Sequence, residues 1–174
     1  MHRTPWFERH FPSIEDNGRL PGILERLEGT PHRLTARFQS TPELDAVTHP
    51  AGTWSLRQEI GHLGDLEPLW TIRMQQIIHG ESHLMVADLS NTQTHQSDHD
   101  AQSVAELIQR FAVLRTKTVT LLRSVRAEEL EHVAIHPRLG TPMRLIDLAY
   151  FVAEHDDHHL AQITALQPQS ATER

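Results

Sequence analysis

The strongest constraint on the fold is an apolar periodicity of three and four residues, which recurs in four long segments of this 174-residue chain. Apolar side chains at this spacing fall on one face of an α-helix, so each segment predicts an amphipathic helix. The predicted helices cover residues 20–39, 55–78, 103–126 and 141–166. With a long loop at 80–100 and a short extended segment at 132–141, this order predicts an all-α four-helix bundle.

Capping residues and prolines set the expected helix limits. Ser103 and Glu106 form a capping-box pattern, and Thr53 or Ser55 is expected to cap the second helix, with Glu59 near the position for a capping interaction. Thr141 is expected to cap the fourth helix, with prolines at its first position (142) and after its end (168). Prolines at 31 and 68 lie inside predicted helices, so we expect a kink or a break at the first and a bend at the second.

Length and composition predict a single domain over residues 1–174, with an irregular lead-in at 1–18, a turn at 40–45 and a frayed tail at 168–174. The chain has no cysteine, which excludes disulfides and thiolate metal ligands. A formal net charge of −7 without a basic run argues against a nucleic-acid partner. We find no apolar run of membrane-spanning length and no signal-peptide core, so we expect a soluble cytoplasmic protein without a membrane partner.

Two histidines lie on the apolar stripe of the fourth predicted helix. His155 and His159 are one turn apart, so their imidazoles share a face and can converge on one metal ion. The chain has 14 histidines, and two buried neutral histidines with hydrogen-bond partners would also fit this spacing. His158 lies on another face, toward solvent or behind the ligands. His62, in the second helix, is the best candidate for a third ligand, although a lone histidine there is commonly a packing residue.

Three motifs, read together, resemble the DinB/YfiT-like superfamily of metal-binding four-helix bundles. They are Thr-Trp-Ser-Leu-Arg-Gln-Glu-Ile-Gly-His-Leu at 53–63, His-Pro-Arg-Leu-Gly-Thr-Pro-Met-Arg-Leu-Ile-Asp-Leu at 136–148, and His-Asp-Asp-His-His-Leu-Ala-Gln-Ile at 155–163. The resemblance spans residues 20–166. It implies that His62, His155 and His159 hold a divalent metal, often zinc or nickel, with water in the open positions.

The resemblance also implies a range of activities. Family members include transferases that use a low-molecular-weight thiol, hydrolases, and stress-associated proteins of no known activity. Three neutral imidazoles leave an ion its charge and an open position, at which water could be deprotonated or a thiol cosubstrate could bind as thiolate. We therefore expect S-transfer to a small electrophilic substrate. The alternatives are hydrolysis of a small molecule, metal binding without catalysis, or a structural bundle with satisfied core histidines.

Several carboxylates could orient an imidazole or accept a proton. Asp65 lies one turn after His62, and Asp156 and Asp157 follow His155. Each of the three fits solvent exposure at a bundle end as well, so no catalytic residue is assigned. Weaker candidates of the same kind are the side chains at 59 and 162.

Three further features have two readings each. Arg73 could meet an anionic cosubstrate, although an exposed helix charge is the usual reading. The polar segment 98–100 could bind a metal adventitiously, but a solvated loop is expected. Trp6, Phe7 and Phe11 are expected to pack across a bundle end; they could equally form the contact of a homodimer.

Overall fold

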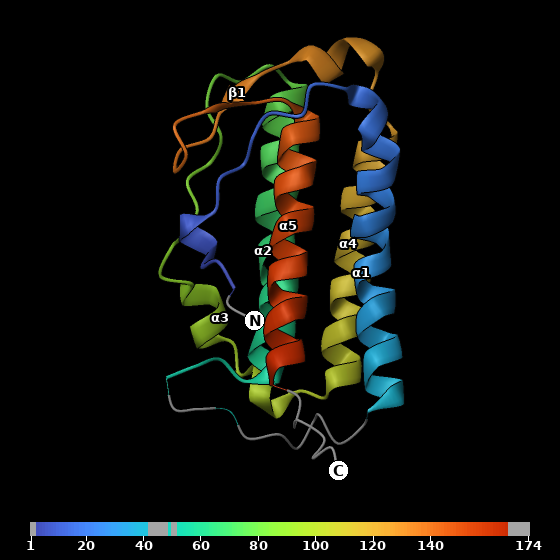
Figure 1. Ribbon diagram of the computed structural model, residues 1–174, viewed down its shortest axis with the longest axis vertical. Coiled ribbons are helices and arrows are strands. Elements are labelled where there is room, and N and C mark those ends of the chain that lie inside the picture. Colours follow the sequence, from blue (N-terminus) through green and yellow to red (C-terminus); the bar gives the residue numbers. More distant parts are fainter. Residues whose placement is uncertain (1–2, 42–48, 50–51, 167–174) are drawn as a thin grey trace.

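The computed structural model describes residues 3–41, 49 and 52–166, and it is a four-helix bundle (Figure 1). The long helices are α1 (Leu20–Ser40), α2 (Leu56–Ile78), α4 (Val104–Arg123) and α5 (Leu145–Ala165), and a short helix α3 (Thr92–Gln96) lies beside the bundle. Two short strands, β1 (Ala134–Ile135) and β2 (Pro142–Met143), form an antiparallel pair at one end. The predicted turn at 40–45 and the predicted tail at 168–174 lie largely or wholly outside the described residues.

The order of the helices around the bundle determines which side chains can meet. α2 packs against α4 and α5, and α1 packs against the same two helices. α1 and α2 therefore lie diagonally across the bundle, although they are consecutive in the sequence. This arrangement places α2 beside α5, the two helices that carry the candidate ligands. No helix in the described part of the chain is long and apolar enough to cross a membrane.

α1 is continuous through Pro31, so of the two outcomes predicted there, a kink or a break, the break is wrong. A proline inside a helix leaves the carbonyl four residues earlier without its N–H donor, which here is the carbonyl of Leu27. Arg115 of α4 donates a hydrogen bond from Nη1 to that oxygen at 3.0 Å. A tertiary contact thus replaces the missing helical hydrogen bond.

The helix starts are partly as predicted. Ser103 caps α4 through the expected capping box with Glu106. Ser55 caps α2, but its capping-box partner is Gln58 and not the residue at 59. The predicted start of the fourth helix at 141 is wrong, because Pro142 belongs to β2 and pairs with β1. α5 begins at Leu145, where Asp147 accepts a hydrogen bond from the backbone N–H of Arg144 at 2.9 Å.

The bundle core has two apolar clusters with a polar layer between them. One cluster includes residues 23, 70, 119 and 152, and the other includes residues 34, 60, 111 and 160. The four long helices contribute Thr30, Glu67, Arg115 and Asp156 to this layer, and each of these buried polar side chains lies between its helix's residues of the two clusters. Arg115 is bonded to Glu67 and Asp156, so this layer joins α2, α4 and α5 in one network.

The segment expected to be a solvated loop is partly packed against α2. It contains α3 and a 3-10 turn at His99–Ala101, and Leu84, Thr94 and His99 are buried. The prediction of a solvated loop at 98–100 is therefore wrong for His99. This segment contributes polar partners to the site described next.

Candidate metal site

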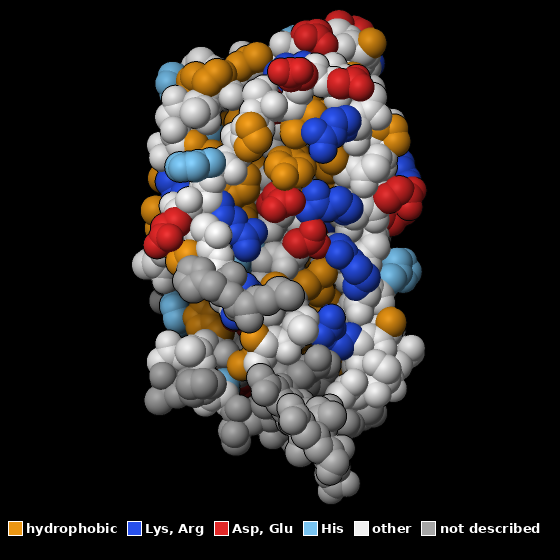
Figure 2. All heavy atoms as spheres, in the orientation of Figure 1, with side chains coloured by type: hydrophobic (Ala, Val, Ile, Leu, Met, Phe, Trp, Pro, Cys, Tyr) orange, Lys and Arg blue, Asp and Glu red, His pale blue; other side chains and the backbone are white. Residues whose placement is uncertain are grey.

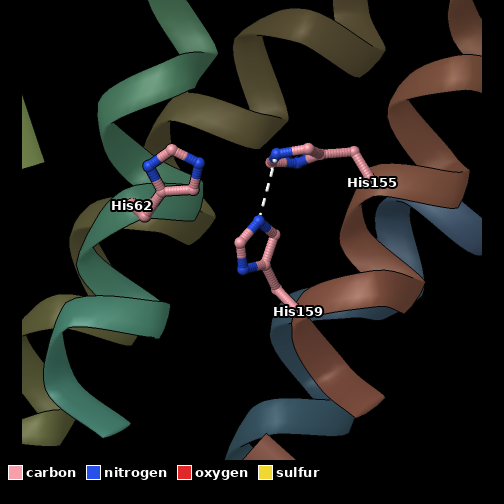
Figure 3. Close-up of side chains that lie close together, drawn as sticks. All are labelled: His62, His155 and His159. Carbon is pink, nitrogen blue, oxygen red and sulfur yellow. Dashed lines mark hydrogen bonds between the residues drawn. The ribbon is translucent and has the colours of Figure 1, made fainter. Parts of the chain in front are cut away.

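Three buried imidazoles converge between α2 and α5 (Figure 3). His62 comes from α2, and His155 and His159 come from successive turns of α5. One ring nitrogen of each lies within 4.8 Å of those of the other two. The Nε2 atoms of His155 and His159 are 3.1 Å apart. The structure thus brings together the three histidines that the sequence analysis selected.

Hydrogen bonds fix the tautomers of two of these rings. Nδ1 of His159 lies 2.5 Å from a carboxylate oxygen of Glu59, and it donates to that oxygen when the carboxyl group is ionised. Nδ1 of His62 lies 2.9 Å from the hydroxyl of Thr94, which itself donates to Asp65 at 3.1 Å and so accepts from the ring. In both rings the lone pair is left on Nε2. Outward partners of this kind orient metal-binding imidazoles.

His155 differs from the other two rings. Its Nδ1 is buried and has no hydrogen-bond partner among the described residues. Its ring instead has aromatic neighbours, with the ring centroids of Trp6 at 5.1 Å and of Trp70 at 5.5 Å. No described neighbour therefore orients the ring of His155 through a hydrogen bond at Nδ1.

The surroundings keep the three imidazoles neutral. Burial and the neighbouring histidines lower the pKa of His62 to about 2 and lower the pKa of His155 well below its usual value. Burial also lowers the pKa of His159 to about 4. Burial has the opposite effect on the carboxyl group of Glu59, whose pKa it raises to about 7. Neutral imidazoles are the form that binds metal ions.

These residues fit a divalent metal ion. Zinc–nitrogen bonds of about 2.0–2.1 Å in tetrahedral geometry place two ring nitrogens about 3.3 Å apart, close to the 3.1 Å between His155 and His159. A set of three nitrogen donors suits zinc, nickel, copper or iron. The set also leaves room for a further ligand from the adjoining cavity, which has a volume of about 880 Å³.

The carboxylates that the sequence analysis selected lie in three different environments. Asp65 is connected to His62 through Thr94, and it also accepts from His99 Nε2 and Arg110 Nη2, each at 2.8 Å. The other two carboxylates bond to cations away from the imidazoles.

Asp156 accepts hydrogen bonds from Arg115 and Thr30 in the polar layer. Asp157 accepts from Arg26 and Arg33 of α1. Figure 2 shows acidic and basic side chains interleaved over α1 and α5. Hydrogen bonds to these cations occupy both side chains away from the candidate site.

The other polar candidates from the sequence have different contacts or exposure in the structure than expected. Glu59, a weaker candidate in the sequence, makes a direct hydrogen bond to the imidazole of His159, one of the three candidate ligands. Arg73 is only 2% exposed, so its reading as an exposed helix charge is wrong. Two other polar side chains, His158 and Gln162, line the cavity.

The N-terminal segment lies against the site, not across a bundle end. The rings of Trp6 and Phe11 pack against Phe151, and Phe7 is exposed at the edge of the cavity. A homodimer contact through this segment stays a prediction.

Sequence reasoning missed Thr94 and the close contact that holds its segment in place. Periodicity gives no signal in this segment. Gly61, however, precedes His62 on α2, and a Cβ atom there would lie 2.5 Å from the His99 ring. That glycine was the available signal that another segment packs closely on α2.

The four-helix bundle and the three buried histidines on two adjacent helices place this chain in the class of candidate metal-binding bundles. The sequence profile of the DinB superfamily matches residues 26–163, and the chain belongs to this superfamily. The solved structure of YfiT from Bacillus subtilis, titled "a probable metal-dependent hydrolase with an unusual four-helix bundle topology", has the same fold. Its TM-score is 0.73 at 21% identity, over 91% of this chain and 90% of that one.

Two curated relatives have similar sequences over most of their length. A protein of Bacillus cereus (strain G9842) is 24% identical over 145 residues, which cover 83% of each chain. A protein of Bacillus pumilus (strain SAFR-032) is 26% identical over 158 residues, which cover 85% of this chain and 81% of the relative. Both are named "Putative metal-dependent hydrolase".

Proposed function

We propose that the protein is a metal-dependent hydrolase of a small molecule, with His62, His155 and His159 as ligands of a divalent ion. The observation that carries this proposal is the convergence of three neutral imidazoles at the wall of a cavity of about 880 Å³. Two of them have Nε2 lone pairs fixed by outward hydrogen bonds. The names of the two curated relatives support the same reaction class.

The ion would supply Lewis acidity, which polarises a substrate and lowers the pKa of water. The chain's own residues would hold and orient the reactants. Glu59 orients the ring of His159 by accepting a hydrogen bond from its Nδ1–H, and Thr94, which donates to Asp65, does the same for His62. Trp6 and Trp54 place apolar rings beside the imidazoles, which limits the access of bulk water.

Transfer of a low-molecular-weight thiol to an electrophile is the second candidate. The size of the cavity favours it, because about 880 Å³ is near the upper end for ligand sites and can hold two small molecules together. The thiol would have to be a cosubstrate, since the chain has no cysteine. Turnover that requires an added thiol would select transfer, and turnover in water alone would select hydrolysis.

The first test is metal analysis of protein purified without a metal-binding tag. We expect about one ion per chain in the wild type, and loss of that ion in His155→Ala with the helical content kept. His32→Ala is the matched control, because His32 is exposed on α1. Retention of metal in His155→Ala, and likewise in His62→Ala and His159→Ala, would show that the ligand assignment is wrong.

A further inference from the structure

Three arginines line the cavity beside the histidines, and two of them, Arg73 and Arg138, have buried side-chain atoms. Arg73 of α2 is 2% exposed, and its Nε donates to the backbone oxygen of Met85 at 2.9 Å. Its Nη1 donates to Nε2 of His136 at 3.2 Å. Both partners are neutral acceptors, so neither balances the charge of this buried guanidinium.

Arg138 adds a second cation to the same cavity. Its Nη2 is buried and has no hydrogen-bond partner in the part of the chain that the structure describes. Its guanidinium lies over the rings of Phe7 and Phe151, at 5.3 and 5.9 Å from their centroids. Ring contacts of this kind occupy the face of a guanidinium and leave the N–H groups at its edge available.

Neither Arg73 nor Arg138 forms an ion pair with a carboxylate of residues 3–41, 49 or 52–166. The acidic residues that line the cavity are engaged elsewhere: Glu59 with His159, and Asp88 with Ser90 and Thr92. Burial and the nearby charge of Arg138 lower the pKa of Arg73 to about 10, which still leaves it charged at neutral pH.

The buried Arg115 shows the contrast. It bonds to two carboxylates, as a charge buried inside a protein normally requires. The positive charges of Arg73 and Arg138 are therefore not balanced by an acidic partner in this cavity, and a bound anion would balance them.

We propose that Arg73 and Arg138 form a subsite for an oxyanion, a carboxylate or a phosphate group, of the substrate. Aromatic rings connect this subsite to the histidines. The ring of Trp70 contacts both Arg73 and His155, and Phe151 contacts His136 beside the subsite. The substrate class is thus a small organic anion with an apolar body, whose reactive group reaches the histidines. Only the placement of the reactive group at the histidines rests on the proposed function, because the oxyanion contacts need no metal.

The test measures anion binding by calorimetry on metal-free protein, so that an ion cannot bind the probe. The probes are phenylacetate, phenyl phosphate and the neutral phenylacetamide. We expect one or both anions to bind at least tenfold more tightly than the amide, and the tighter of the two identifies the oxyanion. Arg138→Gln should weaken anion binding at least tenfold.

Arg123→Gln is the matched control, because Arg123 is an exposed arginine that pairs with Glu28. We expect it to bind both anions like the wild type. Arg73→Gln is the second test of the subsite. Because Arg73 is buried, its anion binding is interpreted only if the circular dichroism of the variant matches that of the wild type. Equal binding of the amide and the anions, or unchanged anion binding in Arg138→Gln, would overturn the subsite. Neither result bears on metal content, and absence of metal from the wild type in the first test would leave the anion result standing.

Discussion

Replacement of Arg115 by methionine should destabilise the bundle more than replacement of any surface arginine. All five N–H groups of this guanidinium donate hydrogen bonds: Nε and Nη2 to Glu67, Nη1 and Nη2 to Asp156, and Nη1 also to the carbonyl of Leu27. Methionine keeps much of the length of the side chain but provides no donor. The substitution would leave two buried carboxylates and one carbonyl oxygen without this cation.

The structure sets the expected magnitude. Removal of one partner from a buried ion pair costs about 3–5 kcal/mol, and an unsatisfied carbonyl adds about 1–3 kcal/mol. Burial already raises the pKa of Glu67, so protonation of this carboxyl group offsets part of the cost. We expect a net loss of about 4 kcal/mol in the free energy of unfolding, which is a large part of the stability of a typical domain.

Urea unfolding at pH 7, followed by circular dichroism, measures this free energy directly. Arg123→Met is the control, because its exposed pair with Glu28 contributes less than about 1 kcal/mol. In a triple variant, Arg115→Met with Glu67→Met and Asp156→Leu, the carboxylates are removed as well, and we expect it to recover at least half of the loss. A loss below about 1 kcal/mol in Arg115→Met alone would refute the view that this network holds the helices together.

Two further predictions concern the site. Glu59→Gln should weaken metal binding about 10- to 100-fold, because an amide accepts a weaker hydrogen bond from Nδ1 of His159 than a carboxylate does. Competition with a chelator measures the metal affinity. An unchanged affinity would show that Glu59 does not support the site. The second prediction concerns pH. Burial and the charges of Arg73 and Arg138 lower the pKa of His136 to about 4, so the unfolded chain binds this proton below about pH 6.5 while the folded chain does not. The free energy of unfolding of the wild type should therefore fall as the pH decreases from 6.5 to 4. Urea unfolding at several pH values measures the slope of this free energy against pH, and His136→Gln should reduce the slope by up to one proton. Equal slopes in the two proteins would contradict the lowered pKa of His136.

The sequence predicted most of the long helices and the three histidines. Apolar periodicity is a local property, and it located α2 and α4 to within a few residues. The spacing of His155 and His159 placed both on one face of α5, and His62 was the best candidate for a third ligand from its place in the second helix before the resemblance to a family supported it. These features follow from helix geometry and motif order, so no tertiary information was needed to find them.

The errors occurred where tertiary contacts override local rules. Pro31 does not end α1, because Arg115, far along the chain, satisfies the freed carbonyl. Pro142 does not start α5, because it pairs with β1. Arg73 is polar and lies on a helix, but it is buried and donates to Met85 and His136, residues outside α2 that no periodicity of α2 could reveal.

The placement of α2 beside α5 determines when the candidate site can form during synthesis of the chain in the cell. α5 follows every other bundle helix in the chain and carries two of the three candidate ligands, so a growing chain cannot present the complete site until its last helix has been made. The apolar clusters and the Arg115 network require no ion, unlike a zinc finger, in which the metal drives folding. We therefore expect metal to enter an already folded protein. Cells starved of metal should accumulate folded, inactive chains that recover when the supply returns, without new synthesis.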